Sequence, residues 1–296
     1  MQSLALDDPS WLTTFPCRVM PARDEWLVGL LLRCDEVNHW ESGETFRSLL
    51  RSTNHPGFGL ESSLVVVPYS LLERLAPLLM MSPQQLLATT YSAELARLYP
   101  AHEPHAKLLL GPGYFPQKWG WRRRTGQRET SRKHKNHMCP ACLAQTRLIK
   151  RTEALPYLQY CPLHQIALQD QCSCGTPLLF FSRGVPPFTC SGCGLDWAHW
   201  PHVAIPSARM TLEHNIWALY EFFLLQGTGE LKASALRLAL RQIQEGKLLQ
   251  LKLRRKKMVY GTAFHPNQLS LEYLVDILVS LGIAPKDIAD GDSSLI

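Results

Sequence analysis

Four short motifs between residues 139 and 193 decide how this chain should fold: Cys-Pro-Ala-Cys at 139–142, Cys-Pro-Leu-His at 161–164, Cys-Ser-Cys at 172–174 and Cys-Ser-Gly-Cys at 190–193. Close spacing lets both side chains of a tight turn face one ion, and a structural zinc ion takes four such ligands in a tetrahedron. Paired in chain order, the motifs enclose 18 residues (143–160) and 15 residues (175–189), spacings typical of zinc ribbons. The sequence therefore predicts two zinc ions, with the ligands Cys139, Cys142, Cys161 and His164 for one and Cys172, Cys174, Cys190 and Cys193 for the other.

Two other arrangements of these cysteines are weaker. A cross-brace would join Cys139 and Cys142 to Cys172 and Cys174, but sequential pairing closes shorter loops at a lower entropic cost. A disulfide framework needs an oxidising compartment, and residues 1–12 lack the charged and apolar regions of a secretory signal peptide. Each predicted site has four protein ligands and keeps no position open for water, so we expect both metals to be structural.

Length and composition set the outer limits on the class of protein. A chain of 296 residues is long enough for two or three compact units. It contains no run of 18 apolar residues, which argues against a membrane span and favours a cytoplasmic protein. The formal net charge is +6 and the basic residues are clustered, which favours an anionic partner. Cys17 and Cys34 lie far from the motifs, and we expect them to be reduced thiols.

The first part of the chain is predicted to be helical. We interpret residues 1–20 as an extended arm and residues 21–117 as a helical unit. The pattern at 24–33 predicts a buried helix with acidic residues in its first turn and Trp26 in the core. Gly29, in the middle of this helix, indicates the close approach of another element, because glycine costs stability at a helical position without such a reason.

A helix-turn-helix pattern follows. Pro68 should open one helix, a turn falls near residues 80–81, and Ser82 should cap a second helix that begins at Pro83. Such a pair can place its second helix in a DNA major groove. The residues expected to be exposed on that helix are Gln84, Gln85 and Thr89. Because none of them is arginine or lysine, we favour a helical hairpin used for packing or protein contact over one that reads bases.

Two basic segments could contact a nucleic acid or an acidic protein. One is the linker at 118–137, where basic residues alternate with two tryptophans, and the other lies at 247–257. The alternative for both segments is a solvated stretch that contacts nothing. The candidate contact residues are Arg122, Arg123, Arg124, Arg128, Arg132, Lys133, Lys252, Arg254, Arg255, Lys256 and Lys257.

Residues 206–296 form the last predicted part, after zinc ribbons at 138–205. We expect a helix capped by Thr211 that runs to Gly227, a second helix at about 231–245, and a third at about 271–281 capped by Ser270. Residues 290–296 should form a disordered tail. The predicted fold is thus mainly α with small zinc-ribbon β elements, built as an N-terminal helix-turn-helix-like unit, two tandem ribbons and a C-terminal helical unit.

Catalytic motifs are missing from the sequence. There is no G-x-x-x-x-G-K-[ST], no H-E-x-x-H and no G-x-S-x-G, so phosphate cradling, zinc proteolysis and acyl transfer lack their usual signatures. The acidic residues are scattered, which leaves a two-metal nuclease as a minor alternative. We therefore predict a protein that is not an enzyme.

The order of these motifs resembles the TniQ family of transposon target-selection proteins. The resemblance rests on the segments at 24–33, 71–76, 82–86 and 138–143, followed by the spaced ligands from Cys161 to Cys193. It implies a non-enzymatic adaptor of the bacterial cytoplasm and nucleoid. Such an adaptor would link a CRISPR effector complex with its guide RNA, bound at target DNA, to an AAA+ ATPase that recruits the transposase. Only about 90 residues follow the ribbons, which favours RNA-guided targeting over the alternative of a stand-alone DNA-binding selector or transcription-factor-like zinc protein.

Overall fold

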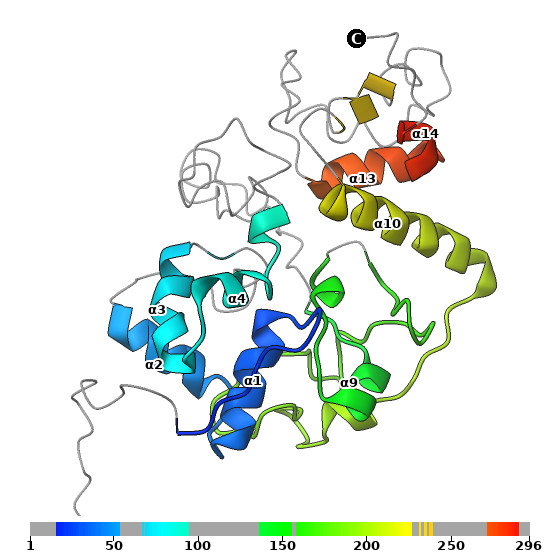
Figure 1. Ribbon diagram of the computed structural model, residues 1–296. Helices are drawn as coiled ribbons and strands as arrows, with labels where there is room; N and C mark the ends of the chain where they lie inside the picture. Colours follow the sequence, from blue (N-terminus) through cyan, green and yellow to red (C-terminus); the bar gives the residue numbers. More distant parts are fainter. Residues whose placement is uncertain are drawn as a thin grey trace, which may run out of the picture. The chain divides into compact units, whose positions relative to one another are not determined.

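The computed structural model describes residues 16–53, 67, 69–94, 136–155, 158–226, 231, 234, 235, 237, 238 and 271–289 (Figure 1). The chain divides into two compact units. Unit 1 comprises Met1–Ser92, Thr130–Leu155 and Ile166–Val203, and unit 2 comprises Ala93–Glu129, Pro156–Gln165 and Ala204–Ile296. Most regular structure in the described residues is helical, as predicted. β-structure there is limited to isolated bridges, so the predicted ribbons have no multi-residue strands in this part of the chain.

Unit 1 is built on one thoroughly buried helix. Its helices are α1 (Leu27–Val37), α2 (Glu44–Thr53), α3 (Tyr69–Leu79), α4 (Pro83–Leu87) and α9 (Pro140–Thr146), with 3-10 turns η3 (Arg151–Ala154) and η4 (Trp197–His199). Eight of the 11 residues of α1 are buried, and Trp26, just before it, packs edge-on against Phe180 with ring centroids 5.3 Å apart. The prediction that Trp26 belongs to the core is confirmed.

The start of α1 differs from the prediction. The helix begins at Leu27 and has no acidic residue in its first turn. Glu25 instead lies before the helix, fully buried, where its carboxylate accepts hydrogen bonds from Arg33 at 3.0 and 2.9 Å and from the Ala22 N–H at 2.8 Å. Burial raises the pKa of Glu25, against the opposing effect of these donors. Glu25 therefore forms a buried ion pair with Arg33 and does not interact with the dipole of α1 from its first turn.

The α3–α4 hairpin follows the sequence prediction at its turn. Met80 adopts a positive φ of 52° between the two helices, and Ser82 caps α4 in a capping box with Gln85. However, α4 has only five residues and ends at Leu87. The prediction that Thr89 is exposed is wrong, because Thr89 is buried and its hydroxyl donates to the Leu86 carbonyl at 2.6 Å. The surface available for reading bases is smaller than predicted.

Unit 2 contains α10 (Ser207–Leu225), α13 (Leu271–Ser280) and α14 (Pro285–Ala289). The first of these starts at Ser207, directly after Pro206, and not at Thr211 as predicted. Proline presets its own φ and the helix can begin right after it, so no side-chain cap is needed. α10 and α13 pack together through buried residues that include Leu219, Phe223 and Leu278.

Only some of the other predictions for residues 206–296 fall on described residues and are confirmed. α13 matches the predicted last helix, α14 was not predicted, and the described residues between 231 and 238 are helical as expected. The arm at 1–15, the basic segments at 118–135 and 247–257, the rest of the 231–245 helix, Ser270 and the tail at 290–296 lie outside the described residues. Among the described helices, none has the length and hydropathy needed to cross a membrane.

Candidate metal centres

The eight predicted ligands form two groups. The histidine cluster consists of Cys139, Cys142, Cys161 and His164, and the all-cysteine cluster consists of Cys172, Cys174, Cys190 and Cys193. Within each group, all four ligand atoms lie within 4.8 Å of one another. This grouping follows chain order and matches the sequential pairing, not the cross-brace. All nine cysteines are free thiols, so no disulfide competes with the clusters.

The spacing of the ligand atoms fits a small tetrahedral cation. Zinc–sulfur bonds of about 2.3 Å place the sulfurs of a tetrahedron about 3.8 Å apart. The Sγ atoms of Cys172 and Cys193 are 3.6 Å apart, as are those of Cys174 and Cys190. Cys161 Sγ lies 3.5 Å from His164 Nδ1, in keeping with the shorter zinc–nitrogen bond. Both clusters could therefore hold a metal ion.

A helix positions the first half of the histidine cluster. Cys139 is the N-cap of α9, Pro140 occupies its first turn, and the Cys142 N–H points at Cys139 Sγ over 3.4 Å. The sequence predicts a turn here, and the structure extends it into a helix whose first N–H groups face the thiolate charge. Behind the ligands, the buried carboxylate of Glu153 accepts the Cys139 N–H at 3.2 Å. This contact fixes the direction from which Cys139 enters the cluster.

The second half of the histidine cluster is a tight turn held by α10. Gln165 has a positive φ of 55° and its N–H donates to the Cys161 carbonyl at 2.8 Å, which closes the turn. Glu213 of α10 is buried and accepts the Gln159 N–H at 3.1 Å and Arg209 Nε at 3.1 Å. The segment that leads into Cys161 is thereby fixed to the helix.

Glycine turns build the all-cysteine cluster. In its first half, Gly175 has a φ of 87° and donates its N–H to the Cys172 carbonyl at 2.9 Å. Thr176 Oγ1 lies 3.2 Å from Cys174 Sγ. Hydrogen bonds with Thr176 lower the pKa of the Cys174 thiol to about 6. These contacts favour the thiolate form of Cys174, the form that binds a metal ion.

The second half of the all-cysteine cluster is a knuckle around Cys190. The Gly192 N–H points at Cys190 Sγ over 3.4 Å, and the Gly194 N–H, at a φ of 72°, donates to the Cys190 carbonyl at 2.8 Å. The Leu195 N–H favours the Cys193 thiolate, but desolvation and the neighbouring sulfurs outweigh it and raise the pKa of Cys193 to about 12. A bound cation would displace the protons that these sulfurs otherwise retain.

The segment that follows α9 joins the start of α1 through its backbone. The Trp26 N–H donates to the Ile149 carbonyl at 2.8 Å, and the Arg151 N–H donates to the Asp24 carbonyl at 2.9 Å. A Cβ on Gly29 would lie 3.2 Å from both the Cβ and the N of Ile149. The close approach predicted at Gly29 is thus confirmed, and its partner is the chain between two metal ligands.

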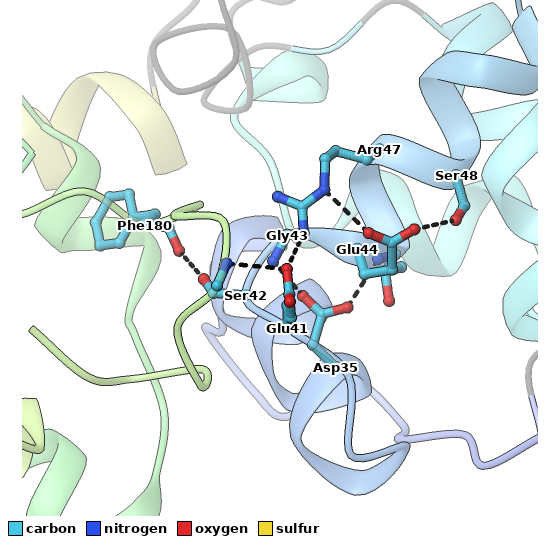
Figure 2. A network of polar contacts seen from close by, with 10 residues as sticks. Asp35, Glu41, Ser42, Gly43, Glu44, Arg47, Ser48 and Phe180 are labelled. Carbon is cyan, nitrogen blue, oxygen red and sulfur yellow. Dashed lines mark hydrogen bonds and ion pairs between the residues drawn. The ribbon is translucent and has the colours of Figure 1, made fainter. Parts of the chain in front are cut away.

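The loop inside the all-cysteine cluster joins the α1–α2 connection through side chains (Figure 2). Ser42 Oγ donates to the Phe180 carbonyl at 2.6 Å, and the Ser42 N–H donates to the Val185 carbonyl at 2.9 Å. A Cβ on Gly43 would come within 2.7 Å of Phe181 Cβ, and the Phe181 ring stacks on Phe46 with centroids 5.2 Å apart. The loop is therefore packed tightly against the helices.

Asp35 organises this connection from α1. Its fully buried carboxylate accepts the Gly43 N–H at 2.6 Å and the Thr45 N–H at 2.8 Å, which caps the start of α2 (Figure 2). Burial raises the pKa of Asp35 to about 6. The capping residue lies in α1 and not next to the start of α2, so the local signals for α2 are weak and the sequence does not predict this helix.

Arg147 connects three elements of unit 1. It ends α9 in the left-handed conformation, with a φ of 58°. Its guanidinium forms ion pairs of 2.8 Å with Glu36 of α1 and with Asp196, the N-cap of η4, and lies 4.8 Å from the centroid of the Phe188 ring. Desolvation disfavours the charged form of Arg147, but the carboxylates of Glu36 and Asp196 outweigh it and raise the pKa of Arg147.

Several supporting residues had no clear signal in the sequence. Glu153, Glu213 and Thr176 act through contacts that no local motif encodes. Gly192 and Gly194 flank Cys193, and this pattern alone could have indicated a knuckle with positive-φ glycine. The predicted nucleic-acid contacts Arg122, Arg123, Arg124, Arg128, Arg132, Lys133, Lys252, Arg254, Arg255, Lys256 and Lys257 lie outside the described residues.

These features define a mainly helical protein with two Cys/His clusters, each of which could hold a metal ion. The TniQ family model matches residues 16–168, just over half of the chain, and the protein belongs to the TniQ family. The match covers the helices of unit 1 up to α9 and all four ligands of the histidine cluster, and it ends before Cys172. No curated protein matches the sequence. Family membership indicates a role in the selection of transposon target sites.

Proposed function

We propose that this protein is a non-enzymatic adaptor in transposon target-site selection. It would link an RNA-guided CRISPR effector complex, bound at target DNA, to an AAA+ ATPase that recruits the transposase. The observation that carries the proposal is the TniQ family match over residues 16–168. The two clusters support it, because four protein ligands around each metal leave no open position for catalysis.

We further propose that both clusters hold zinc and that both ions are structural. One cluster has three thiols and an imidazole, and the other has four thiols. Such ligands at tetrahedral spacing suit zinc better than hard cations, which prefer oxygen ligands. Bound zinc would supply cross-links within segments that have almost no regular structure of their own. The protein itself positions the ligands: α9 places Cys139 and Cys142, and the glycine turns place the four ligands of the other cluster.

A rigid scaffold suits an adaptor because binding two partners at once costs less when the surfaces are already ordered. Backbone pairing at 24–27 with 149–151, and the hydrogen bonds of Ser42 to the Phe180 and Val185 carbonyls, fix the metal-binding segments of unit 1 to its helices. Charge would select partners and steer their encounter. The segments with Arg122 to Arg124 and with Lys252 to Lys257 are our candidates for contacts with acidic protein or with the backbone of target DNA.

Purification of the tagged protein from its native host, followed by identification of the bound chains, tests the adaptor role. We expect an AAA+ ATPase and the protein and RNA of a CRISPR effector complex. Reversal of Arg122, Arg123 and Arg124 to glutamate should weaken this assembly and leave the zinc content unchanged. A triple reversal at the exposed residues Arg18, Arg23 and Arg183 makes the same change in charge and serves as the control. Recovery of neither partner, together with cleavage or modification of a substrate by the isolated protein, would contradict the proposal.

The alternative is a selector that reads DNA unaided, and α4 offers little support for it. A helix of five residues with Thr89 buried beyond its end presents mainly Gln84 and Gln85 to a groove. A specific binder should prefer its own site over random DNA by about a thousandfold or more at physiological salt. We expect only weak binding that falls steeply as salt increases, as measured by titration of labelled duplexes.

A further inference from the structure

The two clusters differ in how far solvent reaches their sulfur atoms. In the histidine cluster, Cys139, Cys142 and Cys161 are at most 1% exposed. In the all-cysteine cluster, two ligands are buried and two are exposed, namely Cys174 and Cys193. A small oxidant in solution can therefore reach two cysteine residues of the second cluster without any opening of the fold.

The exposed sulfurs each have a buried neighbour at reaction distance. Cys174 Sγ lies 3.6 Å from that of the buried Cys190, and Cys193 Sγ lies 3.6 Å from that of the buried Cys172. An attacking thiolate placed next to a resolving cysteine is the arrangement of thiols that oxidise reversibly to a disulfide. The cluster contains this arrangement twice.

We propose that the all-cysteine cluster is an oxidation site for hydroperoxides, in which Cys174 and Cys193 react first and zinc is released, while the histidine cluster keeps its metal. The proposal rests on the zinc occupancy proposed above and goes beyond the adaptor role. It does not depend on any partner, because it concerns the free protein.

The chemistry balances with hydrogen peroxide as the two-electron oxidant. The Cys174 thiolate attacks one peroxide oxygen, the O–O bond breaks, and hydroxide leaves, so that Cys174 becomes a sulfenic acid. The Cys190 thiolate then attacks the Cys174 sulfur and expels a second hydroxide, which forms the disulfide. Two protons from the acid form of the buffer convert both hydroxides to water, and the two sulfurs have supplied the two electrons that reduce the peroxide. Cys193 and Cys172 would react in the same way with a second molecule of hydrogen peroxide. The four sulfurs, now paired in two disulfides, would no longer offer the thiolates that hold a zinc ion.

The product should remain folded and reducible. A disulfide needs its sulfurs about 2.05 Å apart, so each pair at 3.6 Å has to close by only a small movement. The disulfides would span the same segments as the zinc ion and keep the loop at 175–189 closed. A reductant and zinc should then restore the original cluster.

Thr176 sets the reactivity of the first sulfur. Its hydroxyl oxygen accepts from the Cys174 thiol at 3.2 Å. When this sulfur is a thiolate, the rotatable hydroxyl hydrogen can donate to it instead and reduce its nucleophilicity. A Cβ on Gly192 would lie 2.0 Å from Thr176 Oγ1, so only glycine leaves room for this hydroxyl. Thr176→Val removes the hydrogen bond with little change in shape, whereas Thr176→Ser keeps it.

The experiment uses the full chain with Cys17→Ser, because Cys17 is exposed and would itself react with oxidant. Zinc content is measured first, then hydrogen peroxide is added and zinc release is followed with a chromogenic chelator. Tryptic mass spectrometry with two alkylating reagents, one before and one after reduction, identifies the oxidised cysteines. We expect one zinc to leave at least about tenfold faster than the other, with disulfides that contain Cys174 or Cys193.

Two further comparisons keep the result specific. Thr176→Val should release the first zinc a few-fold faster than the parent, and Thr176→Ser should match the parent. Dithiothreitol and zinc should return the content to two ions per chain. Release of both ions at the same rate, or first oxidation at Cys139, Cys142 or Cys161, would overturn the proposal and leave the adaptor role untouched. A protein without zinc at the start would overturn it together with the zinc assignment, while the adaptor role is decided by the purification experiment.

Discussion

The histidine cluster and the all-cysteine cluster bring their segments to the helices of unit 1 by different means. Residues 149–151, which follow Cys142, pair with residues 24–27 through backbone hydrogen bonds, and Gly29 lies against Ile149. The loop between Cys174 and Cys190 is held by Ser42, whose hydroxyl and N–H donate to the Phe180 and Val185 carbonyls, and by the Phe181 ring, which stacks on Phe46. Backbone pairing tolerates many side chains, whereas the second attachment depends on particular residues.

This difference predicts where substitutions should act. Substitutions around the histidine cluster should lower stability mainly at the four ligands and at positions with no room for a larger side chain. Substitutions around the all-cysteine cluster should also lower stability in the loop at 175–189 and in the α1–α2 connection, although these residues are not metal ligands. The predictions below run from the largest expected effect to the smallest.

Loss of a buried ligand should have the largest effect. Cys139→Ser and Cys190→Ser should each reduce the zinc content from two ions to one, because each removes a ligand from a different cluster. The local segment should lose stabilisation on the order of 10 kcal/mol, the scale of structural zinc binding. Hydrogen exchange should show lost protection near 136–155 for the first variant and near 170–196 for the second. Cys17→Ser, at an exposed thiol outside both clusters, is the control, and loss of both ions in either single variant would contradict separate sites.

Gly43→Ala should break the attachment of the all-cysteine loop. The new Cβ would meet Phe181 at 2.7 Å, and the φ of 81° is strained for alanine. Strain and overpacking together should lower the free energy of unfolding by about 4 kcal/mol, measured by denaturant titration. Gly184→Ala is the matched control: its φ is 70° with no atom within 4 Å of the new Cβ, so about 1 kcal/mol is expected. Equal effects for the two variants would show that the close contact with Phe181 is unimportant.

Asp35 should give unit 1 a pH dependence of its own. Its pKa of about 6 in the folded protein lies above the value of an unfolded aspartate, about 3.9. The contribution of this group is therefore complete below about pH 4 and declines as the pH rises through about 6, by up to about 3 kcal/mol. Zinc binding has the opposite trend, because acid protonates the ligands.

Asp35→Asn separates the two trends. The difference in unfolding free energy between wild type and Asp35→Asn, measured in excess zinc from pH 5 to pH 7.5, should shift against the wild type as the pH rises. Because the zinc ligands are identical in both proteins, their contribution cancels. A difference that does not change with pH would mean that Asp35 keeps an ordinary pKa.

Arg147→Gln should have the smallest effect. Its ion pairs with Glu36 and Asp196 are partly exposed, so they should stabilise the fold by only about 1 kcal/mol together. The loss should shrink as salt is added, because exposed charges are screened. Measurement of thermal unfolding at low and high salt checks this, and a large loss that is independent of salt would contradict it.

The sequence predicted those features that local spacing encodes. The ligand motifs give the two groups in chain order, and Ser82 with Pro83 marks the start of α4. Gly29 correctly indicated a close neighbour, although not which one. The family resemblance agrees with the match over residues 16–168.

The features that were missed depend on contacts that no short sequence motif encodes. The start of α2 is capped by Asp35. Glu25 forms an ion pair with Arg33 and does not lie in the first turn of α1. The Thr89 hydroxyl donates to the Leu86 carbonyl, and its side chain is buried. Glu153 and Glu213 support the histidine cluster from positions that no motif relates to their partners. Such pairs become visible only when the chain is folded.

X-ray absorption at the zinc edge of the purified full chain, combined with metal analysis, tests the zinc assignment most directly. Seven cysteines and one histidine around two ions should give two zinc per chain. The averaged environment should contain seven sulfurs to one nitrogen, at about 2.3 and 2.0 Å, without a water ligand. Fewer than two zinc ions in a folded protein, or oxygen in the first coordination shell, would contradict the two filled structural sites on which this account rests.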